Sequence, residues 1–195
     1  EYSIDVTQSS TTFTFENEKS ATNYGVEIEL RKNFDFLGNK KLFHDLTVFS
    51  NLALIKSRLS FDEGSQAKQD RALQGQSPYV LNGGIQYENG ENGWFGSAVV
   101  NRIGRRIAFV GVDPKFGDTR QDIFEAPRTV LDLQVGKTIG KFNLKFTVGD
   151  IFHQDLVFYQ DANQDGNYTK KAGSDRLIFN YKNGMTMNLA AGYTF

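Results

Sequence analysis

The sequence predicts an all-β fold, an antiparallel transmembrane β-barrel of which about eight strands lie within the 195 residues. Three observations lead to this class. Apolar and polar residues alternate along almost the whole chain, short and long connections follow one another in turn, and aromatic residues gather at both ends of the alternating segments. No apolar run approaches the roughly 18 residues of a membrane helix, so helical spans are excluded.

Each strand is expected where one face of the alternation is apolar. The final segment shows this most clearly, because Met187, Leu189 and Tyr193 fall on one face while Asn188 and Gly192 fall on the other. The expected strands cover residues 4–7, 24–31, 46–55, 79–88, 95–109, 131–139, 142–149 and 185–195.

Two places in the alternation have particular features. In the segment 95–109 the bulky residues Phe95, Val99 and Ile103 are assigned to the apolar face, which places Arg102 on the polar face. Near Asp150 the alternation changes phase, and we expect a β-bulge there.

The connections between these strands divide by length. Short turns are expected at 33–41, at 89–93 and around Gly140, and the two Asn-Gly steps within 89–93 favour a tight hairpin. The long polar connections cover residues 9–23, 60–77, 110–127 and 160–184. Because short and long connections alternate, all short turns lie at one end of the strands, as in outer-membrane barrels with short periplasmic turns and long extracellular loops. The aromatic residues at both ends match the two interfaces of a bilayer.

Composition excludes several classes of function. The chain has 22 basic and 23 acidic residues, a formal net charge of −1, no cysteine and two histidines. A nearly neutral chain has no electrostatic basis for holding nucleic acid, and the lack of cysteine excludes disulfides and thiolate metal sites. Neither His44 nor His153 has a convincing catalytic partner in the sequence, so an enzyme is not expected.

Several stretches, in order along the chain, resemble the C-terminal part of the barrel of TonB-dependent outer-membrane receptors. They are residues 23–30 (NYGVEIEL), 71–79 (RALQGQSPY), 101–107 (NRIGRRI), 125–128 (EAPR) with 131–133 (LDL), and 193–195 (YTF). The last of these, ending in Tyr193 and Phe195, is also similar to the signal by which the barrel-assembly machinery recognises outer-membrane proteins in general.

The resemblance implies a position within a larger molecule. Receptors of this family have a 22-stranded barrel with an N-terminal plug domain inside it and a short motif that couples to TonB. Residues 1–195 would then be the last third of such a barrel, without the plug and the TonB box, in a bacterial outer membrane. The implied function is import of a large solute such as an iron chelate, an oligosaccharide or a peptide. The implied partners are outer-membrane lipid, the TonB complex through the missing N-terminal part, the barrel-assembly machinery, and a surface lipoprotein or other subunit.

A polar wall is expected on the inward face of the barrel. An Arg or Lys that faces lipid near the midplane costs about 2–4 kcal/mol, so charged strand residues are assigned to the interior. Arg105 falls on the lipid side by parity and is expected near the outer head groups. Two roles remain open for the inward residues: contact with a plug or polar solute, or a wall whose charges pair with one another. The residues assigned to this wall are Glu27, Glu29, Arg31, Arg102, Arg106 and Asp132.

One loop has the oxygen-rich spacing of a calcium site. Asp161, Asn163, Asp165 and Asn167 place oxygen ligands at alternate positions, and an intervening glycine favours a sharp turn. The bidentate glutamate expected at the twelfth position is missing, because Ala172 stands there. A turn-rich surface loop accounts for the same residues without metal, and no other cofactor or metal site is expected.

A second function is compatible with the same pattern. Eight strands can close on themselves into a free-standing barrel whose interior is filled by side chains, with a structural or adhesion role. Several positions assigned to the interior are small, among them Gly25, Gly84 and Gly136, which does not suit a densely filled narrow lumen.

Overall fold

The structure, a computed structural model, describes residues 3–5, 12–14, 19–38, 40–61, 71–111, 121–171 and 174–195. Nearly all of its regular structure is β-strand, and all strand pairs are antiparallel. None of the helices in this described part has the length and apolar character that a membrane span requires.

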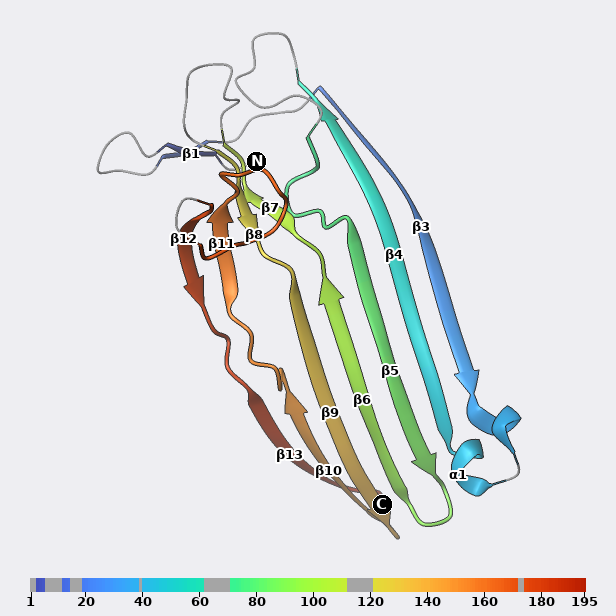
Figure 1. Cartoon of the computed structure of the whole chain (residues 1–195). Helices are drawn as coiled ribbons and strands as arrows, with labels where there is room; N and C mark the ends of the chain where they lie inside the picture. Colours follow the sequence, from blue (N-terminus) through green and yellow to red (C-terminus); the bar gives the residue numbers. More distant parts are fainter. Residues whose placement is uncertain are drawn as a thin grey trace.

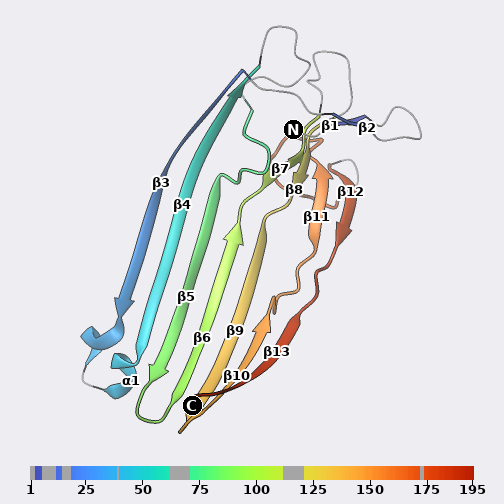
Figure 2. The ribbon, with the colours of Figure 1, turned by 180° about the vertical axis from the view of Figure 1, so that it is seen from behind.

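A curved sheet of seven long strands forms most of the molecule (Figures 1 and 2). Its members, in spatial order, are β13 (Thr186–Tyr193), β10 (Phe142–Gly149), β9 (Arg128–Ile139), β6 (Trp94–Ile103), β5 (Tyr79–Asn89), β4 (Leu46–Ser60) and β3 (Ser20–Asn33). Strands that are neighbours in this sheet also follow one another along the chain, and two of the connections contain further short strands: residues 104–127 between β6 and β9, and residues 150–185 between β10 and β13.

A smaller sheet extends four of these strands beyond one end of the large sheet. Its order, β12-β11-β8-β7, repeats the order β13-β10-β9-β6, because each short strand adjoins the corresponding long one along the chain. The four strands are β7 (Arg106–Phe109), β8 (Ile123–Glu125), β11 (Leu156–Gln160) and β12 (Arg176–Tyr181). We call this unit the upper sheet. A separate hairpin pairs β1 (Ser3–Asp5) with β2 (Thr12–Thr14).

The short connections lie together at the end opposite the upper sheet, as predicted (Figure 1). The turn between β3 and β4 holds the 3-10 helix η1 (Phe34–Leu37) and the helix α1 (Lys41–His44). Gly93 and Gly140 take positive φ values of 71° and 59° in the two tight turns, a conformation that glycine adopts without strain. Of the expected long connections, residues 9–11, 15–18, 62–70, 112–120 and 172–173 lie outside the described residues, as do residues 6–7 of the first expected strand.

Six of the eight expected strands are confirmed as members of the large sheet, and a seventh, 95–109, is confirmed in part: residues 94–103 form β6, whereas residues 106–109 form β7 of the upper sheet. The first expected strand, 4–7, is not among them, because its described residues, 4–5, belong to β1, which within the described part of the chain pairs with β2 alone. Three predictions on connections are wrong, since β2 and the start of β3 lie within 9–23, β8 within 110–127 and β12 within 160–184. At Asp150 the predicted bulge is a longer break, in which φ is 52° and the chain turns before β11 begins at Leu156.

The two faces of the large sheet differ sharply in composition. Directly paired residues point to the same side, so the register assigns every strand residue to a face. We call the face with Val26 and Leu189 the apolar face, and the face with Glu27 and Asn188 the polar face. Val26 is 61% and Leu189 78% exposed, so within the described chain no layer covers the apolar face. The buried core lies mainly in the upper sheet, around Phe158.

Candidate functional site

A row of amide and carboxylate side chains crosses the polar face. Glu29, Asn51, Asn82 and Asn101 are paired in register across β3, β4, β5 and β6. Asn51 Nδ2 donates a hydrogen bond to Glu27 Oε1 at 2.6 Å, and the Asn101 amide donates one to Asn82. Because each amide both donates and accepts, the row can bind a polar surface or solute placed against it.

Four of the residues predicted for the polar wall lie on this face. The register places Glu27, Glu29, Arg31 and Asp132 there. Asp132 has a local structural task, because its Oδ1 accepts a hydrogen bond of 2.9 Å from the Asp150 backbone N–H at the break after β10.

The prediction that Arg102 shares the polar face is wrong. Arg102 pairs directly with Leu81 and Thr129, and these residues belong to the apolar face. The phase of β6 is the reverse of the predicted one: Gly96 and Ala98 lie on the apolar face. Arg102 stands near the upper end of its strand, where it donates hydrogen bonds to the Tyr79 hydroxyl (3.2 Å) and to Thr129 Oγ1 (2.7 Å).

Two further arginines lie at the junction with the upper sheet. The prediction that Arg106 belongs to the polar wall is also wrong, because Arg106 begins β7 of the upper sheet and so belongs to neither face of the large sheet. It forms an ion pair of 2.7 Å with Glu125 of β8. Arg105, expected at the lipid surface, instead forms an ion pair with Asp161 and lies over the Phe124 ring. These contacts fasten the loop after β11 to the junction of β6 and β7.

The apolar face carries charges only at its two ends. In the seven strands, all charged residues on this face are basic. Lys32 and Lys137 lie near the short-turn end, and Lys56, Arg58 and Arg102 lie near the upper end. An apolar band flanked by cations is the pattern expected of strands that cross a lipid layer.

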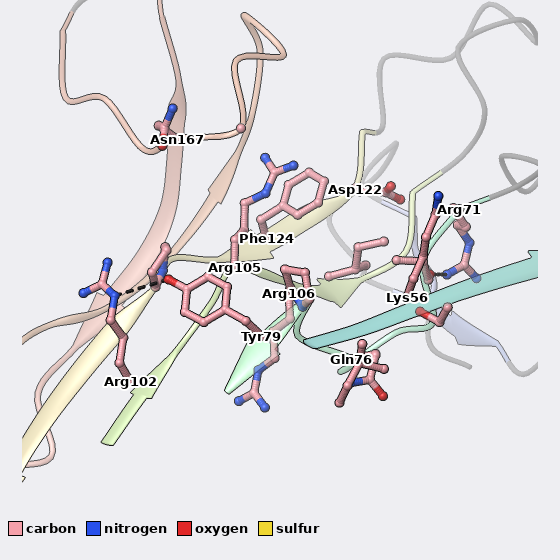
Figure 3. A pocket seen from close by; sticks show the side chains of 17 residues that line it. Lys56, Arg71, Gln76, Tyr79, Arg102, Arg105, Arg106, Asp122, Phe124 and Asn167 are labelled. Atoms are coloured by element: carbon pink, nitrogen blue, oxygen red, sulfur yellow. Dashed lines mark hydrogen bonds between the residues drawn. The ribbon is translucent and has the colours of Figure 1, made fainter. Parts of the chain in front are cut away.

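A pocket of about 670 Å3 opens at the upper end of the sheet (Figure 3). Its lining includes one carboxylate, Asp122, and five basic side chains: Lys56, Arg71, Arg102, Arg105 and Arg106. A smaller hollow of about 350 Å3 adjoins it and shares Ile55, Lys56 and Pro78 with the larger one. The sequence pattern did not single out this pocket, because its residues come from segments far apart in the chain.

The loop predicted as a calcium site is held by contacts within the protein. Asp161 accepts hydrogen bonds from Arg105 and from the Gly166 backbone N–H, and Asp165 accepts one of 2.7 Å from the Asn167 backbone N–H. Asn163 donates a 3.0 Å hydrogen bond to Asp165. Within the described residues, no three acidic or histidine side chains gather to hold a metal ion. Calcium binding stays a prediction.

The two residues of the predicted assembly signal lie at the short-turn end of the sheet. The Tyr193 ring packs against Phe142 with 4.9 Å between ring centres and meets Phe195 edge-on at 5.3 Å. The Phe195 side chain is fully exposed. It is therefore accessible to another protein.

These features define a class of protein. An antiparallel sheet with a continuous uncovered apolar face, a polar opposite face and connections that segregate by length is a segment of a membrane β-barrel wall.

Comparison with known proteins gives a more particular result. No protein-family model and no curated protein matches the chain. Among solved structures, the ferric yersiniabactin uptake receptor FyuA from Yersinia pestis matches 94% of this chain with a TM-score of 0.59. The sequence identity is 16%, so the likeness concerns the fold, and the chain spans 25% of that receptor. The chain has the fold of a barrel portion of a TonB-dependent outer-membrane receptor.

Proposed function

We propose that this chain is the C-terminal part of the barrel wall of a TonB-dependent outer-membrane transporter that imports a large solute. The apolar face contacts lipid, and the polar face, with Glu27, Glu29, Arg31 and Asp132, lines the interior and faces the plug. The matched solved structure is a ferric yersiniabactin uptake receptor, which supports transport as the function. An iron chelate, an oligosaccharide and a peptide remain the candidate solutes.

One observation carries the proposal: a sheet with an exposed apolar face also has two open edges. Within the described residues, neither β3 nor β13 pairs with another strand on its outer side. In lipid each unpaired backbone N–H or C=O costs several kcal/mol, so open edges are not tolerated there. The sheet must therefore continue into further strands. The alternative of a self-closed barrel of eight strands is less well supported, because β3 and β13 do not meet (Figure 1).

The assignment of faces can be tested with single cysteines, because the natural chain has none. Neighbouring residues supply matched pairs, Ile28→Cys with Glu29→Cys and Leu189→Cys with Asn188→Cys. Each variant of the intact receptor is spin-labelled in a bilayer, and its relaxation by oxygen and by a water-soluble nickel complex is compared. We expect oxygen to dominate at positions 28 and 189 and nickel at 29 and 188. The opposite pattern, or equal access at both members of a pair, contradicts the proposal.

Transport is tested on the native polypeptide in its own membrane. An antiserum against this chain should detect a denatured protein several times larger than 22.0 kDa. Uptake from a panel of iron chelates, oligosaccharides and peptides should require the polypeptide and should stop when TonB is deleted. A membrane protein of about 22 kDa whose removal changes adhesion but no uptake would support the free-standing barrel instead.

A further inference from the structure

The upper end of the apolar face combines an apolar hollow with a basic one. The smaller hollow is lined by Tyr24, Val26 and Leu54, which all lie on the apolar face. It adjoins the larger basic pocket through Lys56. A ligand that fills both hollows needs an apolar part and an anionic part side by side.

Two of the basic groups at this place have no carboxylate partner. Arg105 and Arg106 are paired with Asp161 and Glu125. Arg102, in contrast, contacts only neutral oxygens, those of Tyr79 and Thr129, and among the described residues no acidic group pairs with Lys56. Arg102 and Lys56 are both exposed. They are therefore free to receive anionic oxygens from outside the chain.

The spacing of these two cations restricts the ligand. Lys56 lies on β4 and Arg102 on β6, with β5 between them. Arg102 is level with Leu81 and Leu52, and Lys56 lies four residues beyond Leu52, so the two backbones are roughly 17 Å apart and only their long side chains bring the two charges closer. Figure 3 shows the two side chains on either side of Tyr79. A single small anion cannot contact both, whereas a head group with more than one phosphate can.

We propose that this upper-rim site binds a phosphorylated lipid, with its acyl chains on Tyr24, Val26 and Leu54 and its phosphates on Lys56 and Arg102. This inference rests on the proposed function, because it requires the apolar face to lie in a bilayer. Charge complementarity supports it, since no acidic side chain of the seven strands lies on that face. Arginine and lysine are the usual partners of phosphate in proteins.

The test uses the intact receptor in nanodiscs of phosphatidylcholine and native mass spectrometry to count bound lipids. Cardiolipin, with two phosphates, is titrated against phosphatidylglycerol, with one. The variant K56Q/R102Q removes both charges of the site. The control K32Q/K137Q removes two charges from the opposite end of the same face. We expect K56Q/R102Q to weaken cardiolipin binding at least about tenfold, because two charge-assisted contacts are lost, and the control to change it less than about twofold.

Several outcomes would overturn the inference. Equal loss in both double variants would show a general charge effect, and no loss in either would show that the site is not used. Binding of soluble glycerol phosphate as tightly as cardiolipin would indicate a site for an anionic solute rather than for lipid. The melting temperatures of both double variants in pure phosphatidylcholine nanodiscs verify that they fold. If the spin labels show the apolar face in water, the proposed function fails together with this inference; if they show it in lipid without a cardiolipin preference, this inference alone fails.

Discussion

The Phe95 ring occupies the space left free by Gly136. The two residues are paired in register across β6 and β9 on the polar face, and a Cβ on Gly136 would collide with the Phe95 ring and with the Leu144 carbonyl. Phe49 has the same relation to Gly84, whose Cβ would lie 2.6 Å from Phe49 Cζ. Covering a strand glycine with an aromatic ring from the next strand fixes the register and protects the backbone.

Substitution G136A is expected to destabilise the sheet by about 1–3 kcal/mol, because the added methyl group forces the Phe95 ring out of its position. The measurement is urea unfolding of the intact receptor in detergent, in which the unfolded fraction is determined from the loss of the folded band on gels. Gly83 is the matched control, since a Cβ there meets only ordinary contacts of 3.6 Å and more. G83A should be neutral or slightly stabilising. F95A removes the clash with the ring but leaves the one with the Leu144 carbonyl, so G136A should cost less stability in the F95A background than in the natural protein. An equal cost in both backgrounds would contradict the role given to the ring.

The ion pair between Arg105 and Asp161 is expected to hold the loop after β11 in place. Asp161 is buried and also accepts the Gly166 N–H, so D161A removes two contacts and leaves Arg105 without its carboxylate partner. We expect a loss of about 1–3 kcal/mol and faster proteolytic cleavage within residues 161–171. The exposed Asp165 supplies the control, because D165A should change cleavage much less. Equal effects of both substitutions would show that the ion pair does not fasten the loop.

The sequence sufficed to predict the large sheet, because its strands are long and one face of each is apolar. Residues such as Val26, Ile28 and Leu30 repeat with period two over enough positions to fix both strand and face. The upper sheet was missed because β8 has three residues and β12 six, which is too short for alternation to be recognised against the surrounding polar chain.

The error on Arg102 has a physical cause in the neighbouring strand. In β6 the small residues Gly96 and Ala98 lie on the apolar face, and the large Phe95 lies on the polar face because Gly136 makes room for it. If the faces of β6 are assigned from the size of its own side chains, the assignment is therefore reversed. The pairing of Arg102 with Leu81 and of Ala98 with Leu133 gives the correct one. The upper-rim site could be predicted in part, since Lys56 continues the alternation of Leu52 and Leu54, but the pocket around it requires the fold.

Tyr159 is expected to make stability depend on alkaline pH. Its side chain is completely buried in the upper sheet, beside Phe124 and Tyr168, and burial raises the pKa of its hydroxyl above the ordinary value of about 10. The pKa of the Tyr159 hydroxyl is higher in the folded protein than in the unfolded chain. The stability that the buried, neutral hydroxyl contributes is therefore complete below the pKa of the unfolded chain, and it is lost as pH rises through the pKa of the folded protein. The melting temperature should therefore fall less steeply above pH 10 in Y159F than in the natural protein. Identical slopes in both would show that Tyr159 does not cause the dependence.

Phe195 is expected to act in assembly rather than in stability. Its side chain is fully exposed, so F195A removes little packing and should change the free energy of unfolding by less than about 0.5 kcal/mol. If the terminal aromatic residue is read by the barrel-assembly machinery, the same substitution should reduce the amount of folded receptor in the outer membrane several-fold at equal synthesis. T194A is the matched control, because it alters the neighbouring residue and leaves both terminal aromatics in place. Y193A should affect both quantities, since Tyr193 packs on Phe142. Normal membrane levels of F195A, or a loss of stability as large as that of Y193A, would contradict a separate role in assembly.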